Sequence, residues 1–138
     1  MSEIQAVMGR SQLNRLPAMN EARRDVAQRY LDALEDIPGL EWVGDSDSIT
    51  DHVFHLFVVR VTEDYQLTRQ SLYDHLSAND ITTGVHYPPI SELSYYEDVR
   101  GDYDLADDLY NEILSLPMYP GMTDTEQQTV ISALRPGR

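Results

Sequence analysis

The first part of the chain repeats apolar residues with the period of a helix. Val26, Tyr30 and Leu34 follow one another at four-residue intervals, which places them on one face of an α-helix. The pattern predicts a helix over residues 2–35. Pro17 interrupts it, and a proline inside a helix removes a backbone hydrogen bond at a cost of about 3 kcal/mol. We therefore expect the helix to be kinked at Pro17 or divided there.

Two strands are predicted further along the chain. Residues 53–59 are apolar at nearly every position, a pattern typical of a central strand that is buried on both sides. Arg60 and Val61 end this strand. Residues 81–85 form a second short run of strand-forming residues. Pro88 and Pro89 follow it and cannot continue the hydrogen-bonding ladder of a sheet.

Three more helices are expected. One spans residues 67–78 and ends at Asn79 and Asp80, and another precedes the prolines near residue 117. The last begins at Thr123, where Thr123 and Glu126 have the spacing of a capping box. The predicted core positions are Leu72 and Leu76 in the first helix, Leu105, Leu109 and Ile113 in the second, and Val130, Ile131 and Leu134 in the third.

This alternation of helices with short strands predicts an α/β fold. The 138 residues are enough for one hydrophobic core. We predict a single domain over residues 1–138, in which a long N-terminal helix and three further helices pack against one small sheet.

Composition narrows the possible partners and compartments. The formal net charge is −14, with 24 acidic against 10 basic residues, so nucleic acids and anionic membranes would be repelled. No apolar run approaches the roughly 18 residues of a membrane span. The start of the chain has neither the basic nor the apolar region of a signal peptide. Cysteine is absent, which excludes thiolate metal sites. We expect a cytoplasmic protein.

All ten basic residues are arginines, and the sequence contains no lysine. This chain therefore has no side-chain amine that could form a Schiff base. Many surface acids without lysine are also typical of halophilic proteins, in which concentrated salt screens the repulsion between like charges. The alternative is an ordinary acidic protein.

Halophilic adaptation predicts that added salt raises the melting temperature, because screening reduces repulsion among the 24 acidic side chains. Thermal unfolding followed by circular dichroism from low to molar salt measures this effect. Maximal stability at low salt would contradict the prediction.

The histidines offer little support for a metal site. His52 and His55 would point to opposite faces of the predicted strand, which is poor geometry for sharing a metal. Both are expected at the core or its rim, and His75 is expected at the surface of a helix. Calcium-binding, dinucleotide-binding and nucleotide-phosphate loop motifs are absent, as is a nucleophile elbow.

Residues 81–89 are the strongest candidate for a site. A strand-forming run ends near Gly84, and His86 and Tyr87 come just before two prolines. A histidine can shuttle a proton or bind a substrate hydroxyl, and a tyrosine can bind a hydroxyl. The alternative is a loop whose rings only pack against the prolines. Spacing alone leaves both interpretations open.

Several motifs, in the same order, resemble the C-terminal part of the DegT/StrS-type sugar aminotransferases. These are pyridoxal-phosphate (PLP) enzymes of aminotransferase fold type I. The resemblance covers nearly all 138 residues. The matching segments are residues 1–9, Gln12, Leu13, Leu16, Arg23, Arg24, residues 52–55, Phe57, Val58, residues 83–89 (Thr-Gly-Val-His-Tyr-Pro-Pro), residues 116–123 (Leu-Pro-Met-Tyr-Pro-Gly-Met-Thr), Val130 and Ile131.

The resemblance implies the small C-terminal domain of fold type I. In the family, a larger preceding domain carries the Schiff-base lysine, the acid that pairs with the pyridine nitrogen, and the phosphate cradle. The complete enzymes transfer an amino group, usually from glutamate, to a nucleotide keto-sugar. The family loop that matches His86 and Tyr87 borders the nucleotide-sugar side of the active site. The resemblance therefore implies substrate contacts for these two residues, and no catalytic, cofactor or metal residue in this chain.

This chain departs from the family pattern in three places. Family members often have His where it has Ser91 and Pro where it has Ser94, and they keep the helix around Pro17 continuous. Our first hypothesis is a truncated or split aminotransferase domain that is inactive alone. It would act with a separate PLP-domain chain, or as a homo-oligomer. The alternative is a non-catalytic binding module or a gene remnant, and a chance match is the weakest explanation.

Overall fold

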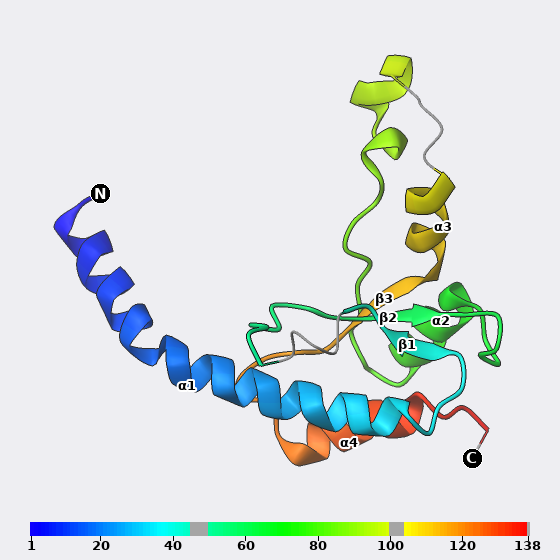
Figure 1. The fold of residues 1–138 in the computed structure, drawn as a ribbon, viewed down its shortest axis with the longest axis horizontal. Helices are drawn as coiled ribbons and strands as arrows, with labels where there is room; N and C mark the ends of the chain where they lie inside the picture. The colour runs from blue at the N-terminus through cyan, green and yellow to red at the C-terminus, as the bar shows by residue number, and fades with distance from the viewer. Residues whose placement is uncertain (45–49, 100–103, 138) are drawn as a thin grey trace.

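The computed structural model describes residues 1–44, 50–99 and 104–137. It has the predicted mixed α/β architecture, with four α-helices around one three-stranded sheet among the described residues (Figure 1). The elements in chain order are α1 (Glu3–Leu34), β1 (Leu40–Trp42), β2 (Phe57–Val61), α2 (Arg69–Ala78), the 3-10 helices η2 (Ile90–Glu92) and η3 (Ser94–Val99), α3 (Asp104–Glu112), β3 (Ile113–Leu116) and α4 (Asp124–Ala133).

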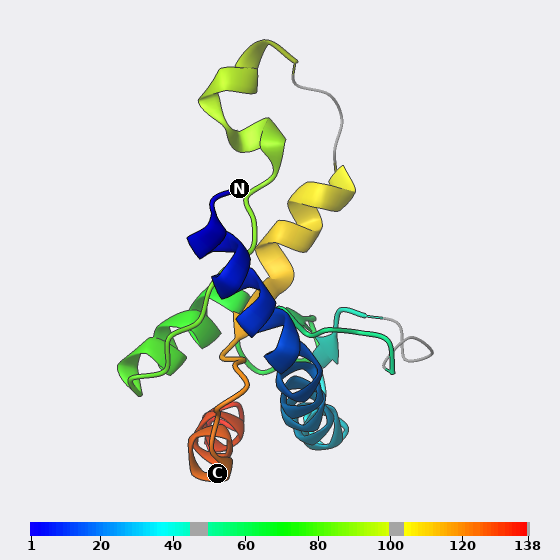
Figure 2. The same cartoon turned by 90° about the vertical axis from the view of Figure 1, so that its left-hand side faces the viewer.

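The long helix α1 is continuous through Pro17, so it is not divided. Figure 1 shows its axis changing direction in the N-terminal half. A capping box begins the helix, in which Ser2 Oγ accepts from the Gln5 N–H and Gln5 Oε1 accepts from the Ser2 N–H. Only the C-terminal half packs on the domain, where Val26, Ala27, Tyr30 and Leu34 are buried. The N-terminal half projects away from the domain (Figures 1 and 2).

The sheet is antiparallel, with strand order β1–β2–β3. The predicted central strand is confirmed in place, but it begins at Phe57 and not at residue 53. Phe54 has φ +45°, a left-handed conformation that extended pairing does not allow. Strand β1 was not predicted, since three residues are too few to show an alternating pattern.

Residues 81–85 do not form the predicted strand. Only Gly84 pairs with the sheet, through an isolated bridge to Ser115 of β3. At the start of this segment, Ile81 donates its N–H to the Leu76 carbonyl at the end of α2. The backbone of Ile81 is therefore bonded to the helix and not to the sheet, and the segment makes one bridge in place of the expected ladder.

The third predicted helix also differs. Helix α3 ends at Glu112, and Ile113 starts β3 rather than closing a helical stripe. Leu105 is 74% exposed and not part of the core. An ion pair between Arg60 of β2 and Glu112 joins the end of α3 to the sheet. Helices η2, η3 and α3 form an arm that rises away from the sheet (Figure 1).

The core lies where the C-terminal half of α1, α2 and α4 meet the sheet. The predicted core positions Leu72, Leu76, Val130, Ile131 and Leu134 are all buried. Helix α4 begins with the predicted capping box of Thr123 and Glu126. Hydrogen bonds from the Thr123 N–H and hydroxyl lower the pKa of the Glu126 carboxyl, and a further bond from Tyr119 adds to this.

Three polar side chains in the core form hydrogen bonds between elements far apart in the sequence. The Tyr30 hydroxyl donates to the Pro117 carbonyl at 3.0 Å, and the Tyr65 hydroxyl donates to the Leu134 carbonyl at 2.9 Å. Burial raises the pKa of Tyr65 to about 12, and burial with neighbouring Tyr119 raises that of Tyr30 still further. Gln127 of α4 is 1% exposed and donates its Nε2 to the Val26 carbonyl of α1 at 2.7 Å, while its Oε1 accepts from Arg29.

The Gln127 amide therefore joins α1 to α4 inside the core. We predict that Gln127→Ala lowers the free energy of unfolding by about 1–3 kcal/mol, because it removes one buried and one partly buried hydrogen bond and leaves a small cavity. Urea unfolding followed by circular dichroism measures the change. The matched control is Gln128→Ala, on the exposed face of the same helix, with an expected change within about 0.5 kcal/mol. Equal effects of the two substitutions would contradict the prediction.

Candidate functional site

His86 and Tyr87 lie directly beyond the point where their segment touches the sheet. The bridge is made by two backbone bonds, from the Gly84 N–H to the Ser115 carbonyl at 3.2 Å and from the Ser115 N–H to the Gly84 carbonyl at 2.7 Å. This contact places His86 at the edge of β3. Tyr87 is 72% exposed, and its ring meets the His86 ring edge-on with centroids 4.9 Å apart.

The His86 ring folds back over Gly84. Its Nδ1 lies 2.9 Å from Oγ of Ser115, which is only 4% exposed. A Cβ on residue 84 would come within 2.7 Å of Cε1 of the His86 ring, so this ring position requires glycine. The sequence motif around Gly84 thus has a physical reason, which is the close approach of the ring to the backbone.

A hollow of about 290 Å³ opens beside this ring. His55 and Thr83 also line it, and the Thr83 hydroxyl is buried without a hydrogen-bond partner among the described residues. The complete lining is His55, Leu56, Thr82, Thr83, Gly84, His86, Ser115, Leu116 and Met118. Three segments far apart in sequence therefore meet here, and they offer hydroxyl and imidazole groups to an oxygen-rich ligand.

The sequence placed Thr83 within the candidate stretch 81–89 without giving it a role, and it did not point to Ser115. The available signal was weak, namely one serine within the apolar run 113–116. A polar residue that is buried in a strand needs a hydrogen-bond partner, and here that partner is His86.

The other two histidines have structural partners. His52 lies at the rim of the core, as expected. Its Nδ1 accepts from the Phe54 N–H at 3.0 Å, and its ring lies 4.3 Å from the Phe54 ring. His75 of α2 lies with Nε2 3.1 Å from the Ala133 carbonyl of α4. In residues 1–44, 50–99 and 104–137, no three His, Asp or Glu side chains are placed to hold a metal ion together.

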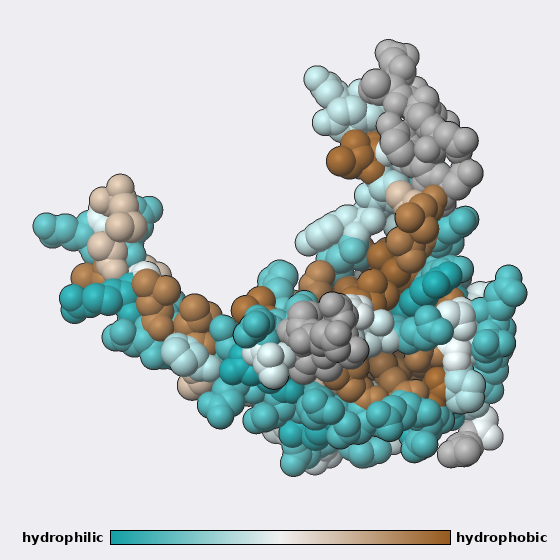
Figure 3. Space-filling model, viewed as in Figure 1, coloured by the Kyte–Doolittle hydropathy of each residue, from teal (hydrophilic) through white to brown (hydrophobic). Residues whose placement is uncertain are grey.

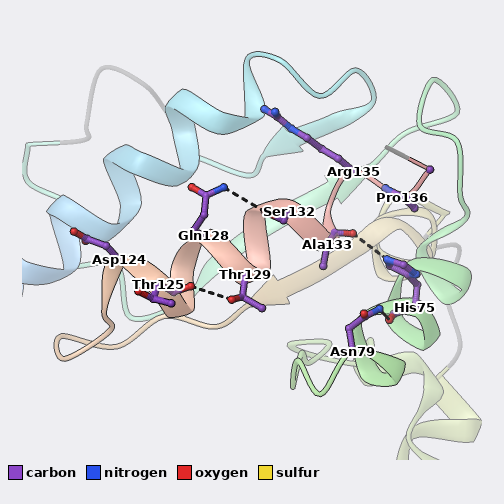
Figure 4. A pocket seen from close by; sticks show the side chains of 11 residues that line it. His75, Asn79, Asp124, Thr125, Gln128, Thr129, Ser132, Ala133, Arg135 and Pro136 are labelled. Atoms are coloured by element: carbon purple, nitrogen blue, oxygen red, sulfur yellow. Dashed lines mark hydrogen bonds between the residues drawn. The ribbon is translucent and has the colours of Figure 1, made fainter.

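His75 borders a larger open groove of about 840 Å³ between α2 and α4 (Figure 4). Its polar groups largely satisfy one another. The Gln128 amide donates to the Ser132 hydroxyl, and the Thr129 hydroxyl donates to the Thr125 carbonyl (Figure 4). Arg135 is an exception, since its buried Nε has no hydrogen-bond partner among the described residues.

Exposed apolar side chains gather on the two limbs of the molecule, which are the projecting half of α1 and the arm. Figure 3 shows hydrophobic side chains along both limbs and a further hydrophobic patch on the body of the domain. These limb surfaces comprise Ile4, Val7, Met8, Leu13 and Leu16 on α1, and Ile90, Leu93, Tyr95 and Leu105 on the arm. So much exposed apolar surface is typical of a face that another structure covers.

Comparison with known proteins identifies the family. The sequence model of the DegT/DnrJ/EryC1/StrS aminotransferase family matches residues 1–135. The chain belongs to this family. The resemblance inferred from the sequence motifs is thereby confirmed.

Individual relatives in the family match over the whole chain. The spore coat polysaccharide biosynthesis protein SpsC of Bacillus subtilis is 36% identical over 98% of the chain. The erythromycin biosynthesis sensory transduction protein EryC1 of Saccharopolyspora erythraea is 32% identical over 99%. The crystal structure of S. venezuelae DesV in complex with a ketimine intermediate superposes with a TM-score of 0.84, at 35% identity over 98% of the chain.

The match covers only part of these proteins. The chain spans about a third of their length, namely 36% of SpsC, 37% of EryC1 and 36% of DesV. The fold described above is therefore the fold of one part of a family member. None of the helices in the described residues is long and apolar enough to cross a membrane.

Proposed function

We propose that residues 1–138 are the smaller, C-terminal domain of a PLP-dependent aminotransferase that acts on nucleotide-linked keto-sugars. The observation that carries this proposal is the family match over residues 1–135, at about a third of the relatives' length. The names of SpsC and EryC1 refer to polysaccharide and erythromycin biosynthesis. These pathways are consistent with a sugar-derived substrate.

The residues of this chain do not fit a PLP site of their own. The sequence contains no lysine, so no side chain can form a Schiff base with PLP. When bound, PLP serves as the electron sink of amino-group transfer. The Schiff-base lysine must then come from another segment or another chain. We propose that the phosphate contacts come from there as well, and that the 138 residues are inactive alone.

The limb surfaces support a role that depends on a partner. Their apolar side chains lie on projecting elements that the domain core does not cover. We propose that they dock against the PLP-binding part, either as a separate chain or within a homo-oligomer. His86 and Tyr87 would then border the nucleotide sugar, with the hollow beside His86 facing its oxygen atoms.

The acid excess supports two finer proposals. We propose that the protein works in a salt-rich cytoplasm, where screening offsets a net charge of −14. The same charge argues against nucleic acids and anionic membranes as partners. The salt dependence of melting described above tests the first of these proposals.

Absorbance and reconstitution test the main proposal. The purified chain mixed with PLP should give no stable internal-aldimine band, because it has no lysine. Adding the polypeptide encoded directly upstream should produce that band, together with amino transfer from glutamate to a nucleotide keto-sugar, measured by chromatography.

Turnover by the 138 residues alone would overturn this proposal. If the upstream polypeptide carries a PLP domain with its lysine and still gives no transfer, a non-catalytic binding module or a remnant explains the chain better. Stable binding between the two polypeptides without transfer would favour the binding module, and no binding would favour the remnant.

Substitution of His86 tests the proposed substrate contact. In the reconstituted enzyme, His86→Ala should raise KM for the nucleotide sugar about tenfold, the equivalent of one lost hydrogen bond. Tyr87→Phe should raise it by a smaller factor, since only the hydroxyl is lost. Steady-state kinetics at saturating glutamate measures both effects.

The matched control is His75→Ala. Among the described residues, each ring makes one hydrogen bond, His86 with Ser115 and His75 with the Ala133 carbonyl. If KM rises equally in the two variants, the cause is a general loss of structure and not the loss of a substrate contact. An unchanged KM in His86→Ala would remove His86 from the substrate site.

A further inference from the structure

The His86 ring is held by one of its two nitrogens. We propose that Ser115 is a positioning residue, whose hydroxyl donates a hydrogen bond to Nδ1 of His86. Neutral His86 then carries its proton on Nε2 and offers an N–H donor to an oxygen atom of the ligand. The hydrogen bond within the chain stands on the geometry alone, whereas the role toward a ligand rests on the proposed function.

Ser115 is firmly placed in the sheet. It lies in β3, where it is paired with Val58 of β2 on one side and bridged to Gly84 on the other. Its side chain is buried, and Oγ lies 2.9 Å from Nδ1 of His86. Because the backbone is bonded on both edges, the hydroxyl has little freedom to move away from the ring.

The direction of the hydrogen bond follows from where the protons go. A hydroxyl can donate to Nδ1 or accept from an Nδ1–H. If it accepted, its own proton would need a second acceptor, and Oγ has no other partner among the described residues. A buried O–H without an acceptor is unfavourable. Donation from Ser115 pairs the buried hydroxyl proton, and it places the ring proton on Nε2.

Two neighbours keep the ring in this position. Gly84 lies beneath it, where a Cβ would come within 2.7 Å of Cε1. The Tyr87 ring packs edge-on against the ring, with centroids 4.9 Å apart. A rotation that moved Nδ1 away from Ser115 would give up the hydrogen bond without gaining another from these neighbours.

The position of the ring proton decides which atom of His86 a ligand contacts. Nε2 of His86 makes no hydrogen bond within the described part of the chain, and the ring borders the hollow that Thr83 also lines. A protonated Nε2 is a donor and cannot accept a proton from a substrate. His86 would therefore bind and orient a hydroxyl, carbonyl or phosphate oxygen, and would not act as a general base through Nε2.

Nuclear magnetic resonance of the chain tests the tautomer without substrate or cofactor. The histidines are labelled with ¹⁵N, and His86→Ala identifies the His86 signals in a long-range ¹H–¹⁵N correlation. Above about pH 8, where histidine is neutral, Nδ1 should resonate as the unprotonated nitrogen and Nε2 as the protonated one. A proton on Nδ1 would overturn the proposal.

Three variants separate positioning from general structure. Ser115→Ala should shift His86 toward a mixture of tautomers, and Ser115→Thr, which keeps the hydroxyl, should retain the Nε2–H form. Gly84→Ala should also disturb the His86 signals, because it displaces the ring while keeping the serine. The control is Ser132→Ala, at an exposed position of α4, which should leave the His86 signals unchanged. Unchanged His86 signals in Ser115→Ala would overturn the proposal.

Kinetics of the reconstituted enzyme separates the positioning role of Ser115 from the proposed contact between His86 and the substrate. Ser115→Ala should raise KM about threefold with little change in kcat, and should have no further effect in the His86→Ala background. An additional effect in that background would contradict positioning through His86. If the tautomer is as expected but His86→Ala leaves KM unchanged, the proposed substrate contact fails and the Ser115 assignment stands.

Discussion

The pairing of β2 with β3 is the constraint on which the rest of the structure depends. Its register sets Phe57 opposite Leu116 and Val58 opposite Ser115. The same pairing buries Phe57 and Val59 against the helices. The far edge of β3 then receives Gly84, and His86 follows two residues later. Since a shift of one residue would turn Ser115 to the other face of the sheet, this register decides whether the site exists.

The domain is well packed on one side and exposes apolar side chains on the other. Beneath the sheet, α1 and α4 are joined by apolar packing and by the buried Gln127 amide. The N-terminal half of α1 and the arm extend beyond this core with exposed apolar surface. The sheet and its helices thus form the packed base from which both limbs project.

Features set by neighbours in the sequence were predictable. The helical period of residues 26–34 and the capping box at Thr123 both appear as expected, because each depends on residues within one or two turns. Residues 81–85 were predicted as a strand from their strand-forming residues. The segment pairs with the sheet only at Gly84, and the Ile81 N–H is bonded to the end of α2 instead. The short strand β1 was not predicted, since three residues are too few to show an alternating pattern.

The sequence by itself determined helices α1, α2 and α4, the central place of β2, the family and the absence of a Schiff-base lysine. These follow from local periodicity, ordered motifs and residue counts. The tertiary structure alone decided that Ser115 holds His86, that Gly84 makes room for the ring, and that His55 and Thr83 share its hollow. Such contacts join segments about 30 residues apart, and sheet pairing across that separation leaves no periodic trace in the sequence.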